Sequence, residues 1–537
     1  FRTCNQVMSQ VDFLAIGFLS ITNKIRDLLD AADSRLARNA WLPALLIIAA
    51  GLAVRGYYAA SCYLNPDEAI HVGLAAQSSL RAAFQESFTQ AHPPLLTIVL
   101  YFLMKLGASE LFLRLPSLAG ATLGAWFWFR WCQRVFGSGV GIGALSLMTF
   151  LPGMLLPAIE IRQYGLLVMG ICGALYALEI ALDRESPAWM VLAYLMLDAA
   201  ILSHYSALWV AAAFSVYGLL RLYQLKAKFP NWMTWACGQA NVALIYAFLY
   251  VRHIRAMRQG WMLNHAVNDY LKNGYFHGGG EALTEFFLGG LQAVFKYLTG
   301  ERQIVNAGIL LFAAGLVFLL LMSARPGGTR RRDLFLLLAM PLLFGFAGTM
   351  LKLQPFLGSR HVTFLFPFLA AGMALALLRW MKYPALAATL AGFAGPAWLL
   401  LTLSSPAIIP NNNPEVLSRS NMVRALEFQK AEIPRDSLIL MDYQTWLEMR
   451  YYRRNLAKAR ACSWEWSFNR ENFQDLVRKV RQDGNIQPGE RIWAMSVSWY
   501  RSPPLAARAL PESWTVIRAV EFGQISLVQF VVPSEDS

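Results

Sequence analysis

Long apolar blocks, almost free of charge, are the feature that most constrains the fold of this 537-residue chain. Examples are the windows 41–54, 206–220, 307–322 and 385–403. Each of them approaches the roughly 20 residues that a helix needs to cross a hydrocarbon layer of ~30 Å. Charged residues make up only 15% of the chain, against about 25% in soluble domains. This excludes a disordered chain and predicts a polytopic membrane protein with some soluble mass attached.

The apolar blocks can be drawn as about eleven membrane spans. They cover 41–58, 116–134, 139–158, 164–181, 188–203, 206–223, 233–251, 304–323, 334–350, 361–379 and 384–403. Lys and Arg gather at alternate connections, namely Arg35, Arg38, Arg130, Arg134, Arg184, Lys226, Lys228, Arg325, Arg330, Arg331, Arg332, Arg379 and Lys382. Such connections face the cytoplasm. The net charge of +14 therefore indicates membrane orientation and not nucleic-acid binding, and the C-terminus is predicted to lie outside.

One shorter apolar segment, 93–108, decides the orientation of everything that follows it. A stretch of about 16 residues is often interfacial. If it spanned, the basic run 325–332 would face outward, against the charge rule. We therefore predict an interfacial helix within a first external loop, 59–115. A second long external loop is predicted at 252–303, with another surface-lying helix at 281–298.

Three parts of the chain follow from these assignments. Residues 1–39 are predicted to form a cytoplasmic or interfacial tail, 40–403 the transmembrane domain, and 404–537 a soluble domain outside the cytoplasm. The residues Asn411–Pro414 are a turn or linker signal. Beyond them, helical patterns at 415–431 and 444–453 alternate with strand-like segments at 437–441, 492–498 and 516–532. This alternation predicts a small α/β domain.

Ionisable side chains recur at the predicted external ends of the spans. The segments are NPDEAIHVGLA with Asp67, Glu68 and His71, AHPPLL with His92, AIEIRQYGLL with Glu160, Arg162 and Tyr164, SHYSALW with His204 and Tyr205, and GSRHVTFLFP with Arg360 and His361. Each segment alone also fits a structural role: helix capping, an ion pair, or anchoring at the interface. Charges at membrane depth are costly. The membrane side of each segment follows from the Lys and Arg residues of the alternate connections, and not from the ionisable residues of these five segments. Their joint occurrence on one face predicts a polar site there.

The chemistry available on that face is limited. The chain has no Walker motif and no GxGxxG motif, and nucleotide-activated donors are absent outside the cytoplasm. A polyprenyl-phosphate sugar is a donor that can be delivered through the membrane. Its phosphate leaving group requires stabilisation by Arg, Lys, His or a metal, and the acceptor hydroxyl requires a general base such as a carboxylate.

The ordered pieces NPDE, AHPPL, LRLPSLAG, EIRQY and SHYSAL resemble a known family. It comprises the dolichyl-phosphate-mannose protein mannosyltransferases and the bacterial aminoarabinose transferases, which are integral-membrane glycosyltransferases with the GT-C fold. The resemblance covers roughly 41–380 and is strongest in 63–165. It implies a mainly α, GT-C transmembrane fold with interfacial helices, to which the pattern beyond 404 adds the small C-terminal α/β domain. The Ala91-His92 pair departs from the Glu-Lys that aminoarabinose transferases tend to have before the two prolines.

The resemblance also implies roles for individual residues. Asp67 is expected to be the catalytic base, with Glu68 beside it, and Glu160 to orient the acceptor or a divalent cation. The remaining predicted substrate-binding residues are His92, Arg162, Tyr164, His204, Tyr205, Arg360 and His361. Of these, Arg360, His92 and Arg162 are expected to neutralise the departing lipid phosphate. The expected reaction is a one-step inversion at the anomeric carbon. No cofactor is indicated, except that a divalent cation is one way to orient the acceptor.

These inferences predict a multi-pass enzyme of the cell inner (cytoplasmic) membrane, in the cell envelope, with its site on the periplasmic or extracellular side. Its partners are a polyprenyl-phosphate sugar such as an undecaprenyl donor, a glycan, lipid or protein acceptor, and membrane lipids, but no nucleic acid. Two other classes stay open: a transporter or flippase for the same lipids, and a non-catalytic membrane subunit that retains the fold. The sugar, hexosyl or pentosyl, and the oligomeric state also stay open.

Overall fold

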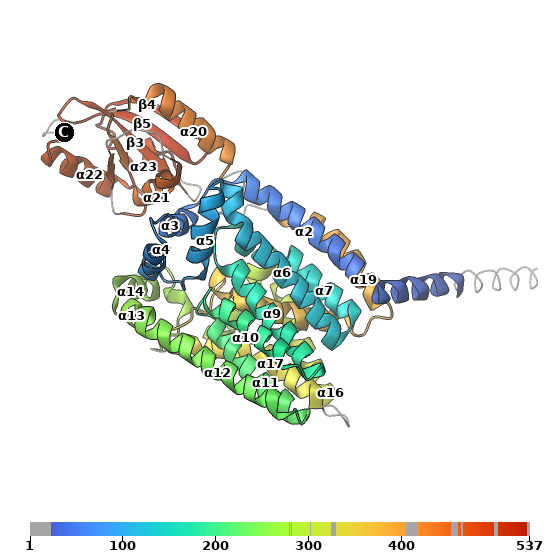
Figure 1. The fold of residues 1–537 in the computed structure, drawn as a ribbon. Helices are drawn as coiled ribbons and strands as arrows, with labels where there is room; N and C mark the ends of the chain where they lie inside the picture. Colours follow the sequence, from blue (N-terminus) through green and yellow to red (C-terminus); the bar gives the residue numbers. More distant parts are fainter. Residues whose placement is uncertain are drawn as a thin grey trace, which may run out of the picture.

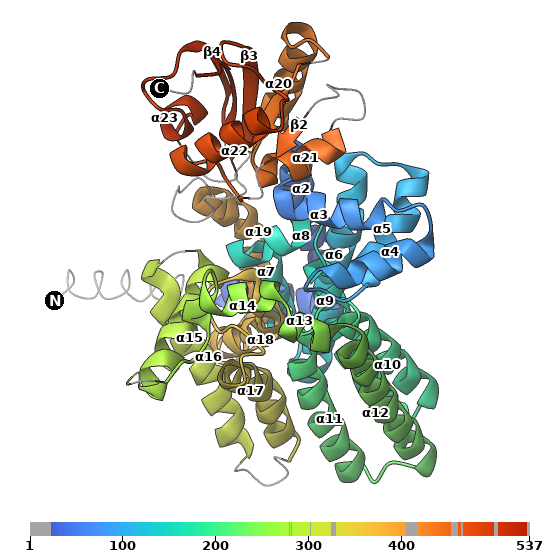
Figure 2. The ribbon, with the colours of Figure 1, turned by 90° about the vertical axis from the view of Figure 1, so that its left-hand side faces the viewer.

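The protein has a long helical body with a small sheet domain at one end (Figures 1 and 2). The structure is a computed structural model that describes residues 23–278, 280, 282–300, 302–323, 329–403, 417–435, 437–452, 460–462, 465–498 and 503–533. The predicted linker signal at 411–414, the first 22 residues of the predicted tail and Arg325 lie outside the described residues.

Each of the eleven predicted spans coincides with a helix or a broken helix. These are α2 (Trp41–Ser61), α6 (Glu110–Phe136), α7 (Ser138–Phe150) with η2 (Pro152–Met154) and α8 (Leu156–Ile159), α9 (Tyr164–Asp183), α10 (Pro187–Ile201), α11 (Ala207–Gln224), α12 (Phe229–Leu249), α16 (Arg302–Ser323), α17 (Thr329–Met350), η5 (Arg360–Leu365) with α18 (Phe366–Leu378), and α19 (Pro384–Leu403). Within the described part of the chain, six helices are long and apolar enough to cross a membrane, or seven if the bent α7–α8 pair is one span. The chain is thus a multi-pass membrane protein, and the number eleven stays a prediction.

The two predicted external loops also contain helices. The first loop forms α3 (Pro66–Ala75), α4 (Leu80–Glu86), η1 (Ser87–Thr89) and α5 (Leu95–Leu106), so the segment 93–108 is indeed a short helix. The second loop follows η3 (Tyr250–Ile254), a π-helical extension of α12. It forms α13 (Arg255–Gln259), α14 (Trp261–Asn268), η4 (Lys272–Gly274) and α15 (Leu283–Thr299). The positions of α5 and α15 relative to the membrane stay predictions.

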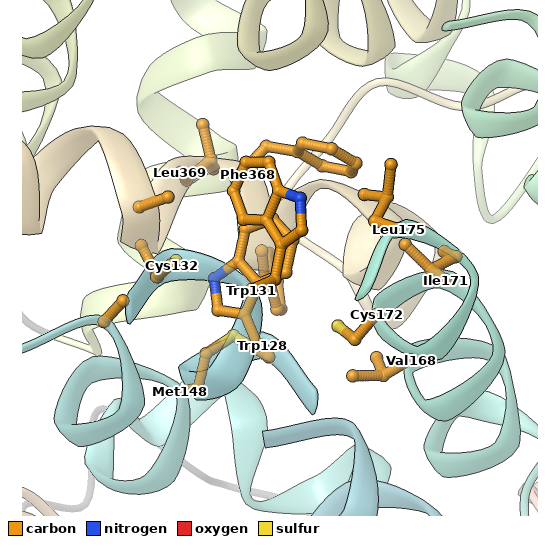
Figure 3. Close-up of a cluster of buried hydrophobic side chains, with 14 of the residues drawn as sticks. Trp128, Trp131, Cys132, Met148, Val168, Ile171, Cys172, Leu175, Phe368 and Leu369 are labelled. Atoms are coloured by element: carbon orange, nitrogen blue, oxygen red, sulfur yellow. The ribbon is translucent and has the colours of Figure 1, made fainter. Parts of the chain in front are cut away.

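The centre of the body is formed by α6, α9 and α18. Trp128 and Trp131 of α6 stack with ring centroids 4.6 Å apart, and Phe368 of α18 lies 5.6 Å from Trp128 (Figure 3). Glycine lets α6 and α9 approach closely, because a Cβ on Gly120 would come within 2.7 Å of the Gly165 backbone. Small residues at such crossings are typical of helices that pack in a membrane.

The helical path bends by 70° between α7 and the segment that contains η2 and α8. Arg55 of α2 is buried at this bend, and its Nη2 donates to the carbonyls of Met148 at 3.0 Å and Thr149 at 3.2 Å. These carbonyls lie at the end of α7, where a helix lacks its own donors. The bend places the segment after α8, which begins with Glu160, beside α3.

The C-terminal part is an α/β domain, as predicted. Its sheet has the order β2-β1-β3-β5-β4, formed by β2 (Arg460–Cys462), β1 (Ile439–Met441), β3 (Arg491–Val497), β5 (Ile525–Val531) and β4 (Val516–Phe522). The strands β2, β1 and β3 are parallel, and β5 and β4 complete the sheet in antiparallel pairing. The helices are α20 (Arg419–Glu432), α21 (Tyr443–Tyr452), α22 (Arg470–Gln482) and α23 (Leu505–Ala509). The sequence interpretation did not include α22, β2 and α23.

Candidate active site

The site begins at the turn between α2 and α3, where local sequence determines the geometry. Asn65 caps α3: its side chain accepts from the Glu68 amide at 2.9 Å, while the Glu68 carboxylate accepts from the Asn65 amide at 3.0 Å. Pro66 occupies the first helical position, where its missing N–H costs nothing. This capping box places Asp67 and Glu68 together in the first turn.

The two neighbouring acids have different environments. Glu68 is 1% exposed, and Arg114 of α6 binds both of its oxygens, at 2.8 and 2.7 Å. The amide of Ile161 donates to the same carboxylate at 2.8 Å. Arg114 also donates to the carbonyls of Cys62 and Tyr63 at the end of α2. The Glu68 carboxylate is therefore occupied by protein groups and holds α2, α3 and α6 together.

Arg114 was not among the predicted site residues, although it lies in the piece LRLPSLAG. An arginine within an apolar stretch near the start of a span is a signal of a buried partner. The sequence does not identify that partner, because Glu68 lies 46 positions away.

Asp67 faces the second part of the site. Its carboxylate is within 3.2 Å of Arg162 Nη1 and forms a close ion pair with Arg360. Glu160 accepts from the Asn65 side chain at 3.1 Å and lies 3.6 Å from Arg360 Nη1. Four predicted residues from three distant segments therefore meet, and Asp67 and Glu160 share one site.

The electrostatics of these two acids differ. Burial raises the pKa of Asp67, but the guanidinium groups of Arg162 and Arg360 outweigh that effect and hold the pKa well below its ordinary value. Burial dominates at Glu160 and raises its pKa, since the opposing effect of Arg360 is smaller and Glu68 adds to the rise. Two carboxyl groups in one site whose pKa values are pushed apart are typical of acid–base chemistry.

Four histidines form a row beside the acids. The ring centroids of His71 and His92 lie 5.7 Å apart, those of His92 and His204 5.6 Å, and those of His204 and His361 6.2 Å. Tyr164 lies 5.3 Å from His204. The four histidines of this row come from four separate segments, although the chain has only seven histidines. The histidine row was not predicted as a unit, because spacing along the chain does not reveal it.

The environment keeps these histidines neutral. Burial lowers the pKa of both His71 and His204 to about 3, with the positive charge of Arg162 adding to the effect. The same two causes place the pKa of His92 well below its ordinary value. Within the described part of the chain, Nδ1 of His71 and Nδ1 of His92 are buried without a hydrogen-bond partner. Unsatisfied buried polar atoms of this kind call for a water or ligand partner.

Tyr205 lies outside this arrangement. Its hydroxyl is 2.5 Å from Nδ1 of His253, in the segment Tyr250–Ile254 that follows α12. The predicted substrate contact of Tyr205 therefore has no direct support from the geometry.

An open groove of about 540 Å³ lies between α15 and the segment 356–358, which precedes Arg360. It is lined by Asn273, Glu285, Phe286, Gly289, Gly290, Ala293, Lys296, Tyr297, Gly300, Phe356, Leu357 and Gly358. Tyr297 connects the groove to the site: burial raises the pKa of its hydroxyl, Glu160 adds to the rise, and Arg360 opposes it. Among the described residues no group of three or more His, Cys, Asp or Glu is arranged to hold a metal ion.

The helical body, which carries the capping turn and the cluster of acids, arginines and histidines, has the GT-C fold that the sequence predicts. Residues 91–250 match the family described as dolichyl-phosphate-mannose-protein mannosyltransferase. This match confirms the resemblance found in the sequence. A search among curated proteins finds no significant match.

Solved structures support the same fold. The chain is similar to ArnT from Cupriavidus metallidurans in the apo state, with a TM-score of 0.50, 12% identity, and coverage of 92% of this chain and 98% of that one. A second structure of that protein, bound to undecaprenyl phosphate, matches with 13% identity, the same TM-score and the same coverage. At such identities the likeness shows the fold.

Proposed function

We propose that this protein transfers a sugar from a polyprenyl-phosphate donor to a hydroxyl group of a glycan, lipid or protein on the non-cytoplasmic face of the cell inner membrane. The observation that carries the proposal is the placement of Asp67 against Arg162 and Arg360, with Glu160 alongside. One structure with the same fold has undecaprenyl phosphate bound, which supports a donor of this class.

The lipid phosphate would bind to the arginines. Arg360 has the more accessible side chain, 24% exposed, and Arg162 is 6% exposed with Nε lacking a hydrogen-bond partner within the described part of the chain. A planar guanidinium binds phosphate oxygens in a bidentate manner. The neutral rings of His92 and His71 would add uncharged contacts and shape the pocket.

Asp67 would accept the proton of the acceptor hydroxyl. A carboxylate whose pKa is held low is a weak base, and in the free site two guanidinium groups hold it low. A donor phosphate would compete with Asp67 for Arg162 and Arg360, which would raise the pKa of Asp67 as the donor binds. Donor binding would therefore activate the base.

The reaction would be a single displacement. The acceptor oxygen forms a bond to the anomeric carbon as its proton passes to Asp67. The bond from that carbon to the phosphate oxygen breaks, and its electron pair leaves on the lipid phosphate, where Arg360 and Arg162 stabilise the charge. The configuration at the carbon inverts. Glu160 would orient the acceptor, directly or through a divalent cation, and Glu68 would position α3 through Arg114.

The test is Asp67→Asn in the purified full-length protein, assayed with a polyprenyl-phosphate sugar and an acceptor extract from the source membrane. The variant keeps the size of the side chain but loses its basicity. We expect turnover to fall by about 100-fold or more, with an unchanged melting temperature.

Asp183→Asn is the matched control, since Asp183 lies in a half-exposed ion pair with Arg134 at the other end of α9. It should transfer sugar at the wild-type rate. Wild-type turnover by Asp67→Asn would refute the assignment of the base. Movement of lipid-linked sugar across vesicles without transfer would favour a flippase instead.

A further inference from the structure

The C-terminal domain contacts the turn that presents Asp67. In both views α21 lies directly against α3 (Figures 1 and 2). The Leu64 amide donates to the Tyr452 hydroxyl at 2.8 Å, and the Tyr63 amide donates to the Leu417 carbonyl at 2.9 Å. Two consecutive amides of the α2–α3 turn therefore have partners in the C-terminal domain.

The Tyr452 hydroxyl also reaches the start of α6. It donates to Oε1 of Glu110, while Arg419 of α20 binds Oε2 of the same carboxylate at 2.7 Å. Glu110 is 4% exposed. The hydroxyl thus bridges the turn before α3 and the first residue of α6, one helical turn before Arg114.

The geometry links this bridge to Asp67 over a short path. Leu64 precedes Asn65, whose side chain caps α3 and binds Glu160. Asp67 is in the first turn of the helix that Asn65 caps. A shift of the Leu64 backbone therefore moves the cap and, with it, the Asp67 carboxylate relative to Arg162 and Arg360.

We infer that Tyr452 is a positioning residue, through which the C-terminal domain sets the place of the α2–α3 turn and of Asp67. The inference rests on the proposed function, and it extends the machinery of transfer to a domain whose described residues contribute no acid or base to the site. Errors of about 1 Å in the placement of reacting groups can reduce rates by roughly 100-fold, so a bridge of this kind affects catalysis without touching substrate.

The experiment compares Tyr452→Phe with Tyr451→Phe in the full-length protein. Tyr452→Phe removes the hydroxyl that bonds Leu64 and Glu110 but keeps the ring. Tyr451→Phe is the matched control, because the hydroxyl that it removes donates to the Ala108 carbonyl at 2.6 Å in the same interface. We expect kcat to fall roughly tenfold in Tyr452→Phe, with the donor KM within about twofold, and wild-type kcat in Tyr451→Phe.

A second comparison tests whether the effect passes through Asp67. In the Asp67→Asn background, Tyr452→Phe should cause no further loss of the residual rate, since coupled residues are non-additive. The same fold-loss in both backgrounds would overturn the inference, as would equal kcat losses in the two tyrosine variants.

Hydrogen exchange gives a readout that does not need turnover. Peptides covering residues 62–68 should exchange about tenfold faster in Tyr452→Phe than in wild type or Tyr451→Phe. Unchanged exchange in these peptides overturns the inference whether or not transfer is observed. If Asp67→Asn retains full activity, the proposed function fails. If Asp67→Asn is inactive but Tyr452→Phe has wild-type kcat, only the present inference fails.

Discussion

At the level of single residues, Asp67 and Glu68 show how adjacent carboxyl groups acquire different properties. The Glu68 carboxylate is enclosed by Arg114 and backbone amides, whereas Asp67 has a side chain that is 16% exposed and faces Arg162 and Arg360. The sequence places both in one helical turn and assigns both to catalysis. The contacts with arginine distinguish the two acids: Glu68 binds Arg114 and is a positioning group, whereas Asp67 faces Arg162 and Arg360 and is the candidate base.

The opposing pKa shifts lead to a prediction about pH. The lowered pKa of Asp67 keeps this base ionised in the free enzyme as the pH falls, so kcat/KM should show no acid limb from Asp67 over the usable range. In the donor complex the arginines are shared with phosphate, and the pKa of Asp67 rises. As the pH is lowered, Asp67 should therefore become protonated, and kcat should decrease, at a higher pH than kcat/KM does. Initial rates between pH 5 and pH 8, at limiting and saturating donor, would measure both profiles.

Glu160→Gln provides the control, because the pKa of Glu160 is raised in the free site and its own titration would otherwise add an acid limb to kcat/KM. His71, which also faces Asp67, is kept in both proteins. Coincident acid limbs for kcat and kcat/KM in Glu160→Gln would contradict activation of Asp67 by the donor.

At the level of elements, the start of α3 is the unit that joins fold and site. The same asparagine caps the helix and binds Glu160, so a local sequence signal and a tertiary contact coincide at Asn65. A second capping box, Asn469 with Asn472, begins α22 in the C-terminal domain. The two boxes have the same hydrogen-bond pattern, with Glu68 at the third position of α3 and Asn472 at that of α22, but the first adjoins the acids and arginines of the site.

This similarity provides a controlled prediction. Asn65→Ala and Asn469→Ala should each lower the stability of their helix by about 1 kcal/mol, seen as a small decrease in the melting temperature in detergent. Only Asn65→Ala should also reduce sugar transfer, because it releases Glu160 and loosens the turn before Asp67. Equal transfer rates in the two variants would show that the cap of α3 does not position the site.

At the level of the whole molecule, charge distribution and span number determine which face carries the site. With an odd number of spans and with the basic connections in the cytoplasm, the acids, the groove and the C-terminal domain are predicted to lie outside. In Figure 2 the sheet domain lies at one end of the body, next to α3. The orientation itself stays a prediction.

Labelling of introduced cysteines tests the orientation. Asn485→Cys, in an exposed turn after α22, should react with a membrane-impermeant maleimide in intact spheroplasts. Glu185→Cys, exposed between α9 and α10, should react only after the membrane is permeabilised. The wild-type chain measures background from its native cysteines, including the exposed Cys237. The reverse pattern would place the site in the cytoplasm.

The sequence by itself determined the features that depend on local composition and period. Apolar blocks indicated a membrane protein, the NPDE turn indicated a capped helix, and alternating patterns indicated a C-terminal α/β domain, all of which the structure contains. It also indicated that Asp67, Glu160, Arg162 and Arg360 belong to one site, because charges at membrane depth require partners.

Only the tertiary structure decided which side chains contact one another. The crossing of helices and the docking of a domain produce the Arg114–Glu68 pair, the histidine row and the bond between Leu64 and Tyr452, which lie 388 positions apart. No spacing along the chain encodes such contacts, because they depend on how apolar faces pack in three dimensions. The amphipathic α22 is different: Phe473, Leu476, Val477 and Val480 carry a helical pattern that was visible in the sequence and was missed.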